Sequence, residues 1–317
     1  MLLQILLLAA GLLGVMKGAD WLVESASELA RKKGISELTI GLTVVAFGTS
    51  APELAVNIQA NSEIVFGNTI GSNVFNLMCI LGIAGIIYPL FVQRKTVYIE
   101  IPLSVLSAVL VLFLVNDAWF GHSENILTAF DGILLLVGFA LFLFYVLRNA
   151  TSDIEIDQNQ PARSTSIVIV FMLLGIAGLV LGGKAVVYSA SSLATLAGVS
   201  DTVIALTIVS FGTSLPELAT SIVAALKKRP DLAVGNVIGS NIFNLLFVLA
   251  ISCFVGSKEY KTYLNSDLYV LIIASLGLFA FMFLRGKKKL DRYEAALLLV
   301  GFVGYMVFVI NRELHFL

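Results

Sequence analysis

The stretch AFGTSAPELA, residues 46–55, lies inside a long apolar run, and a second copy, SFGTSLPELA, occupies residues 210–219. The first copy combines a glycine, a proline and a carboxylate: Gly48, Pro52 and Glu53. Glycine weakens a helix, and proline removes one backbone donor and clashes with a preceding carbonyl. Both copies therefore predict a helix that is broken within an apolar segment, with a charged side chain at the break.

The spacing of the polar residues predicts where the break falls. Ser50 stands three residues before Glu53, with Pro52 between them, which is the spacing of a capping box. One half-helix is expected to end near residues 46–48 and a second to begin near Ser50. Non-helical backbone at membrane depth is tolerated only where it lines a cavity or is buried in protein. The break therefore predicts an internal polar site.

The composition is that of an integral membrane protein. Of the 317 residues, 58% are hydrophobic and only 13% are charged, whereas soluble domains are roughly 45–50% apolar and about 25% charged. The N-terminal run lacks a basic leader and a cleavage site, so it is interpreted as a span and not as a removed signal. Because a span needs about 20 mostly apolar residues, we expect an all-α membrane protein with ten transmembrane helices, at 2–30, 36–61, 67–88, 97–116, 126–147, 165–196, 200–226, 234–256, 265–285 and 291–311.

The chain contains an internal repeat. Residues 34–60 align without a gap with 198–224, and 16 of the 27 positions are identical. Further on, GNTIGSNVFNLMCILG at 67–82 aligns with GNVIGSNIFNLLFVLA at 235–250, with 10 of 16 positions identical. The identity concentrates in polar and helix-breaking residues, which a duplication that only built a stable bundle does not explain.

The repeat predicts the topology. We expect a first five-helix repeat at 1–148, a cytoplasmic linker at 149–164 and a second repeat at 165–317. Because five is an odd number, the second repeat enters the membrane from the opposite side, and helices 2 and 7 are the broken ones. Inverted repeats of this kind are typical of secondary transporters, whose site lies near the midplane between the repeats.

Lysine and arginine predict the orientation, because cytoplasmic loops carry an excess of both. With the N-terminus outside, fifteen of these residues are cytoplasmic and three are outside, and Lys17 and Lys184 lie within or near spans. We therefore expect a multi-pass protein of the cell membrane with both termini outside. Membrane lipid is its expected surrounding, and no nucleic acid or obligatory protein partner is indicated.

The polar residues of the repeated segments share helix faces, since Ser72 and Asn76, like Thr49 and Glu53, are four residues apart. If these faces converge, the centre holds only oxygen ligands, which suit Na⁺ or Ca²⁺ and not zinc, copper or iron. A lone Ser, Thr or Asn in a span is also a common helix–helix contact, and for each singly that alternative stays open. The candidate ligand side chains are Glu53, Glu217, Thr49, Ser50, Thr213, Ser214, Ser72, Ser240, Asn76 and Asn244, with Asn57 and Ser221 as candidate supporting residues.

The two carboxylates give the centre its function. Two unpaired glutamates in hydrocarbon cost about 2.5 kcal/mol or more each, and a bound cation is the natural compensation. Two negative charges match one Ca²⁺ or two Na⁺. Competition of the two ions for one place is the physical basis of exchange.

The motif GTS-x-PE in both halves, followed each time by GSN-x-FN, resembles the calcium/cation antiporter superfamily, and most closely its prokaryotic sodium/calcium exchanger branch. The resemblance covers the whole chain. It implies exchange of Na⁺ for Ca²⁺ by alternating access, with spans 1 and 6 sliding against the others, and no cofactor. It also implies that Glu53 and Glu217 bridge the calcium and sodium sites and that Ala46 and Ser210 supply carbonyl oxygens.

Three alternatives differ in sequence features. A proton/calcium antiporter of the same superfamily tends to carry extra acids or a histidine in the motif, and this chain lacks them. A cation channel uses a filter or an acidic ring built by several chains, and an enzyme needs a nucleophile–base pair or a metal cluster. One departure is Asn244, where some members of the superfamily carry Asp, so three Na⁺ would exceed the negative charge of the two carboxylates.

Overall fold

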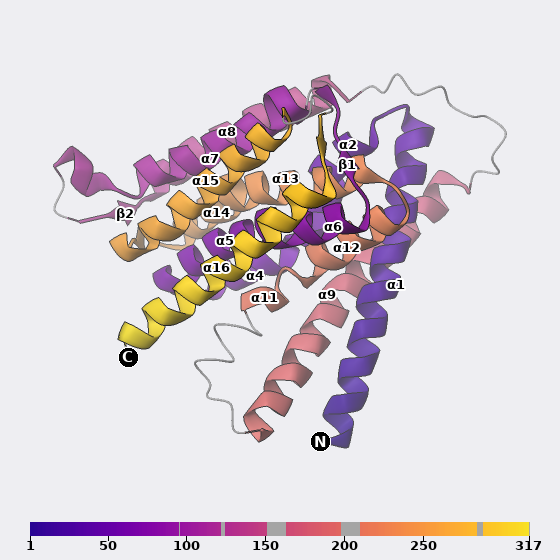
Figure 1. The fold of residues 1–317 in the computed structure, drawn as a ribbon, viewed down its shortest axis with the longest axis horizontal. Coiled ribbons are helices and arrows are strands. Elements are labelled where there is room, and N and C mark those ends of the chain that lie inside the picture. Colours follow the sequence, from indigo (N-terminus) through magenta and orange to yellow (C-terminus); the bar gives the residue numbers. More distant parts are fainter. Residues whose placement is uncertain (95, 122–123, 151–162, 198–209, 284–287, 317) are drawn as a thin grey trace.

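The computed structural model describes residues 1–94, 96–121, 124–150, 163–197, 210–283 and 288–316, and this part of the chain is almost wholly helical (Figure 1). Up to residue 150 the helices are α1 (Leu2–Lys33), α2 (Glu37–Ile40), α3 (Ala46–Thr49), α4 (Ala51–Gln59), α5 (Ser62–Val74), α6 (Leu81–Ile87), α7 (Ile101–Leu114) and α8 (Ala129–Arg148). From residue 163 on they are α9 (Thr165–Leu196), α11 (Ser210–Gly212), α12 (Leu215–Leu226), α13 (Pro230–Phe243), α14 (Leu249–Val255), α15 (Asn265–Phe281) and α16 (Arg292–Phe316). Wider π-helical turns cover Gly41–Val45, Phe75–Ile80, Thr96–Glu100 and Asn244–Val248, and short 3-10 turns cover Asp117–Phe120 and Thr262–Leu264.

Membrane-spanning helices dominate the fold. Within the described residues, eight helical segments are long and apolar enough to cross a membrane, and the bent pair Glu37–Thr49 and Ala51–Gln59 makes a ninth. The expected all-α membrane architecture is therefore confirmed. The expected span at 200–226 is described only from residue 210, so the tenth span stays a prediction.

Two spans form the centre of the bundle. In Ser62–Ile87 and Pro230–Val255, 78% and 83% of the apolar window is buried, whereas in Leu2–Lys33 only 22% is buried. These central spans carry the repeated GSN-x-FN motif. Small residues allow the close packing: a Cβ added at Gly235 would lie 2.8 Å from the Leu38 carbonyl oxygen. The segment that would match Leu38 in the second half lies outside the described residues.

The chain bends by 42° between α3 and α4. Ser50 separates the two helices with φ −85° and ψ 7°, and Ser214 precedes α12 with φ −88° and ψ 7°. Proline lies in the first turn after each serine, where its missing N–H is tolerated. The two copies therefore share the backbone conformation of the serine at the break, although the turn before it differs, because the Ser50 N–H donates to the Ala46 carbonyl and the Ser214 N–H to the Phe211 carbonyl.

Two short antiparallel strand pairs, which the sequence does not predict, join the two halves. β1 (Leu90–Phe91) pairs with β4 (Lys289–Leu290), and β2 (Ile126–Leu127) pairs with β3 (Lys258–Glu259). β1 and β3 each follow a central span, and β2 and β4 each precede the last helix of their half. Exchanging the two halves therefore converts one pair into the other.

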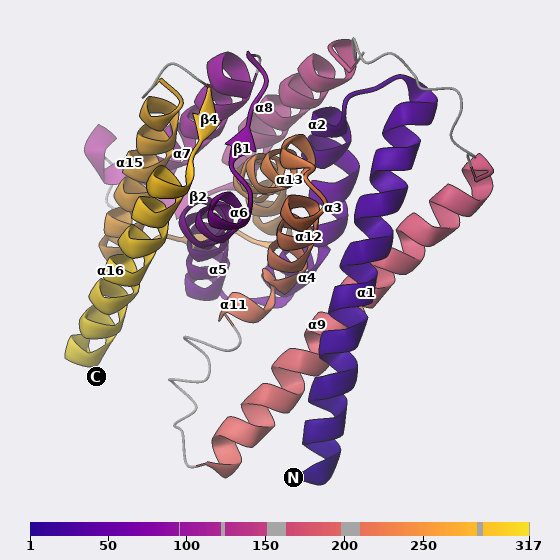
Figure 2. The ribbon, with the colours of Figure 1, turned by 45° about the vertical axis from the view of Figure 1, so that its right-hand side comes forward.

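The longest helices, α1 and α9, have 32 residues each and lie side by side (Figure 2). Their contact is made by glycines that occur with the same spacing on both helices. A Cβ added at Gly18 would lie 2.7 Å from the Gly175 carbonyl oxygen, which is closer than real Cβ atoms approach. The glycine pairs in contact are Gly11 with Gly182, Gly14 with Gly178, and Gly18 with Gly175.

Candidate functional site

Glu53 and Glu217 lie fully buried in the first turns of α4 and α12. Each accepts a hydrogen bond from the serine at the other break. Ser214 Oγ donates to Glu53 Oε1 over 3.1 Å, and Ser50 Oγ donates to Glu217 Oε1 over 2.8 Å. The two breaks therefore meet face to face.

The capping-box interpretation of Ser50 is wrong. Ser50 does occupy the position before α4, but its side chain makes no capping hydrogen bond. The hydroxyl instead donates to the carboxylate of Glu217 in the opposite half, and a hydrogen bond to an ionised acceptor is a strong one.

Some of the buried oxygens that have no hydrogen-bond partner in the described chain belong to candidate ligands, while others, such as Ser275 Oγ and Glu294 Oε2, do not. Within the described residues, Glu53 Oε2 and Glu217 Oε2 are two of those on candidate ligands. A buried polar group left unsatisfied costs about 1–3 kcal/mol, so one such oxygen on each of the two facing glutamates favours a ligand between them. The others among the candidate ligands are Ser72 Oγ, Asn76 Oδ1 and Asn244 Oδ1.

The threonines of the two motifs occupy equivalent positions. Thr49 Oγ1 lies 3.1 Å from Asn236 Oδ1, and Thr213 Oγ1 lies 3.3 Å from Asn68 Oδ1. Ser240 Oγ lies 3.5 Å from Thr49 Oγ1 and donates to Glu217 Oε1 over 3.3 Å. A hydroxyl that donates one hydrogen bond keeps lone pairs for a cation.

The backbone candidates differ in what the structure describes. The break is expected to leave the Ala46 carbonyl without a hydrogen bond. In the structure this carbonyl accepts the Ser50 N–H over 3.0 Å and lies 3.3 Å from Thr49 Oγ1. It has a second lone pair and stays at the break. Ser210 begins α11.

Sequence reasoning missed the asparagines at 68 and 236. Asn236 Nδ2 donates to Ser221 Oγ over 3.0 Å, and Asn68 Nδ2 donates to Asn57 Oδ1 over 2.8 Å. Asn57 and Ser221, the candidate supporting residues, therefore hold side chains that bind the threonines. The signal was present, because Asn follows Gly67 and Gly235 in both copies.

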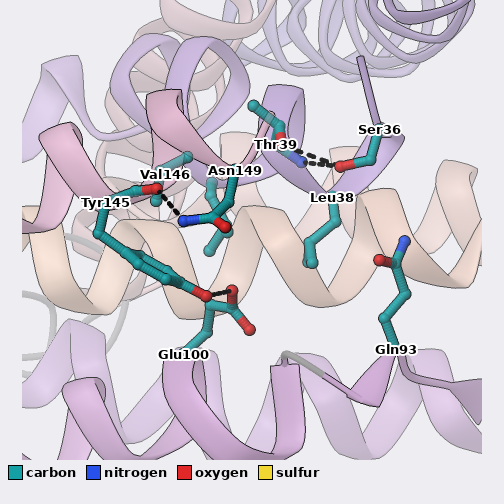
Figure 3. A pocket seen from close by; sticks show the side chains of 9 residues that line it. Ser36, Leu38, Thr39, Gln93, Glu100, Tyr145, Val146 and Asn149 are labelled. Atoms are coloured by element: carbon teal, nitrogen blue, oxygen red, sulfur yellow. Dashed lines mark hydrogen bonds between the residues drawn. The ribbon is translucent and has the colours of Figure 1, made fainter. Parts of the chain in front are cut away.

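A polar pocket, shown in Figure 3, is lined by a different set of residues. It is lined by Ser36 and Thr39 at the start of α2, by Gln93, and by Glu100, whose Oε1 accepts the Tyr145 hydroxyl over 2.8 Å. None of the candidate ligands lines it. Glu100 is thus a buried glutamate outside the site.

Known proteins are similar to this chain over most of its length. The sequence model of the family described as "Sodium/calcium exchanger protein" matches residues 3–148 and 167–311. The inner membrane protein YrbG of Escherichia coli is 34% identical over 314 residues, covering 96% of each chain. The sodium/calcium exchanger MaX1 of Methanosarcina acetivorans is 31% identical over 347 residues, covering 95% of this chain and 97% of that protein.

A solved structure shares the fold. The sodium-calcium exchanger NCX_Mj, soaked with 10 mM Na⁺ and zero Ca²⁺, superposes with a TM-score of 0.83 at 30% identity, covering 96% of this chain and 98% of that one. The fold, together with the matches to the family model, to the relatives and to this solved structure, identifies the protein as a multi-span membrane antiporter. It is a transporter and not an enzyme. The chain belongs to the sodium/calcium exchanger family.

Proposed function

We propose that this chain exchanges Na⁺ for Ca²⁺ by alternating access at the site between the two breaks, with both ions as substrates and without a cofactor. One observation carries the proposal: Glu53 and Glu217 are fully buried together, and their described hydrogen bonds come from neutral hydroxyls. Two ionised groups in this setting need a cation. One Ca²⁺ or two Na⁺ match the charge, so the ions compete.

The ligand set follows from the oxygens at the site. Glu53, Glu217, Ser72, Asn76 and Asn244 contribute the atoms that have no described partner. Further proposed ligands keep lone pairs beside their hydrogen bonds and are Thr49, Ser50, Thr213, Ser214, Ser240 and the carbonyl of Ala46. The carbonyl of Ser210 is proposed as the counterpart of Ala46 in the second repeat. Oxygens of this type are what Ca²⁺ prefers, and because it takes about six to eight of them at once, the set offers more oxygens than a single Ca²⁺ binds.

We propose ten transmembrane helices in two inverted repeats, 1–148 and 165–317, joined by the linker 149–164. The two ranges that match the family model support this division. So does the equivalence of the two strand pairs. In this topology helices 2 and 7 are the broken ones and cross the membrane in opposite directions.

The excess of Lys and Arg in alternate loops supports a cell membrane location with both termini outside. Membrane lipid then covers the exposed apolar side chains, such as Phe144 on α8, Leu173 on α9 and Val300 on α16. Nothing in the proposed exchange requires a protein partner.

Movement is proposed for α1 and α9 together. Their glycine contact maps onto itself when the repeats are exchanged, so it can persist in both states. One contact between this helix pair and the rest of the protein does not map onto itself when the repeats are exchanged. In it, Lys227 at the end of α12 forms ion pairs with Asp20 and Glu24 of α1. In the other repeat, Lys184 on α9 is equivalent to Asp20. Glu63, three residues past the aligned block 34–60, is equivalent to Lys227.

The inverted symmetry predicts that Lys184 and Glu63 pair in the opposite state. Both side chains are exposed here, and Glu63 accepts the Tyr263 hydroxyl. In a background with Cys79 and Cys253 replaced by Ala, the pair Lys184→Cys and Glu63→Cys should cross-link during turnover and stop transport until reduced. Asp20→Cys with Lys227→Cys is the matched control for the state seen here. A control that cross-links while the test pair never does would contradict the prediction.

Ion flux tests the proposed function directly. Na⁺-loaded proteoliposomes diluted into Na⁺-free medium should take up radiolabelled Ca²⁺, and collapse of the Na⁺ gradient by gramicidin at fixed pH should stop the uptake. Uptake driven by a pH gradient alone would instead support a proton/calcium antiporter. Single-channel currents in planar bilayers would support a channel.

A further inference from the structure

Asn73 on α5 and Asn241 on α13 form a reciprocal pair where the two central spans meet. Both side chains are fully buried. Asn73 Nδ2 donates to the Asn241 backbone carbonyl over 3.1 Å, and Asn241 Nδ2 donates to the Asn73 carbonyl over 3.2 Å. A backbone carbonyl can only accept, so both side-chain amides have a fixed orientation.

The fixed amides determine the orientation of two neighbours. Asn241 Oδ1 accepts a hydrogen bond from Asn76 Nδ2 over 3.1 Å. Asn73 Oδ1 accepts one from Asn244 Nδ2 over 3.3 Å. Because an oxygen acceptor needs a donor opposite it, Asn76 and Asn244 must each turn their NH₂ group away from the site.

The oxygen ends of these two amides are therefore left for a cation. Asn76 Oδ1 and Asn244 Oδ1 are buried and have no hydrogen-bond partner in the described part of the chain. A flipped amide would present N–H donors, which repel a cation. The wider π-helical turns Phe75–Ile80 and Asn244–Val248 fall at these residues in both halves, and such turns frequently occur at functional sites.

We propose that Asn73 and Asn241 are positioning residues for cation binding: each fixes the amide of a ligand in the opposite repeat, Asn73 that of Asn244 and Asn241 that of Asn76. This inference rests on the proposed function, in which Asn76 and Asn244 are ligands. It also gives a physical reason for the second asparagine of GSN-x-FN in both copies. The plain alternative is that Asn73 and Asn241 only hold the two helices together.

An aspartate in place of the ligand separates the two roles. A carboxylate has an oxygen at both ends, so it needs no partner to orient it. We expect Asn73→Ala to raise the KM for Ca²⁺ by about five- to tenfold, with a smaller change in kcat. In the Asn244→Asp background the same substitution should leave the KM unchanged or lower it, because the Asn73 oxygen faces the new carboxylate.

The crossed arrangement supplies the control. In the Asn244→Asp background Asn241→Ala should keep its full effect, because it acts through Asn76. In the Asn76→Asp background the pattern should be reversed: Asn241→Ala should leave the KM unchanged or lower it, and Asn73→Ala should keep its full effect. Asn73→Leu, which fills the space left by the amide, replaces Asn73→Ala if the alanine variant does not fold. If Asn73→Ala raised the KM for Ca²⁺ equally in the Asn244→Asp and Asn76→Asp backgrounds, the positioning role would be overturned.

A separate comparison reports on the proposed function. Asn76→Ala and Asn244→Ala should each raise the KM for Ca²⁺, since each removes a ligand. Wild-type KM in both would remove these residues from the ligand set, whatever Asn73 does. If the wild type shows no Na⁺-driven uptake, the proposed exchange fails. Ca²⁺-dependent thermal stabilisation of the same variants then still tests the positioning role, with the same crossed pattern expected.

Discussion

Glu53→Gln and Glu217→Gln should each reduce Na⁺-driven Ca²⁺ uptake by about thirtyfold or more, which corresponds to losing one partner of a buried charge interaction. Glutamine keeps the volume of the side chain and the oxygen that accepts the serine hydrogen bond. It removes one negative charge and one ligand oxygen. The single remaining charge cannot neutralise Ca²⁺, so the ion stays unbound or the loaded site stays charged.

Stability separates loss of binding from loss of fold. The substitution takes an uncompensated charge out of an apolar environment, so the melting temperature of the ion-free protein in detergent should stay the same or rise. Ca²⁺ at one hundred times its Kd should stabilise the wild type by about 2.7 kcal/mol. Neither glutamine variant should show that shift at the same concentration.

Glu100→Gln is the matched control. Glu100 is also a buried glutamate, 3% exposed, but its carboxylate accepts the Tyr145 hydroxyl in the separate pocket. We expect flux near the wild-type level. Normal flux in Glu53→Gln or in Glu217→Gln would remove that residue from its proposed role, because the site would then work with one carboxylate.

The sequence predicts the membrane class and the centre of the site because both depend on local signals. Span positions follow from apolar length, and the two glutamates stand out as charges beside a proline in such spans. The family resemblance, which the comparisons confirm, rests on the same doubled motif. Binding of ions by these residues remains a prediction.

Contacts between the halves could not be predicted in the same way. The spacing of Ser50 and Glu53 favours a local cap, but the hydroxyl of Ser50 binds Glu217, which lies in the other half of the chain. Only the folded structure brings that acceptor close. The pairing of Asn73 with Asn241 and the two strand pairs are also long-range. The repeat indicated which residues are shared but not which of them touch.

Gly18→Ala should reduce transport strongly, whereas Gly14→Ala should be tolerated. The new Cβ at residue 18 would lie 2.7 Å from both the Gly175 carbonyl oxygen and the Leu179 nitrogen. Both are backbone atoms, so α1 and α9 must separate, and overpacking of this kind costs about 1–3 kcal/mol. At residue 14 the nearest atom is the Gly178 carbonyl oxygen at 3.5 Å, which is ordinary contact.

The measurements are Na⁺-driven Ca²⁺ flux and melting temperature for both alanine variants, which make the same chemical change one helical turn apart. Equal behaviour of the two would contradict a tight glycine contact. The direction of the defect carries further information. Because the glycine contact maps onto itself when the repeats are exchanged, Gly18→Ala should slow Ca²⁺ entry and Ca²⁺ exit by the same factor. Lys227 pairs with α1 in the state seen here, and we propose that this ion pair breaks in the opposite state. Loss of Lys227 should therefore shift the balance between the two states, which distinguishes the ion pair from the glycine contact of the moving helices.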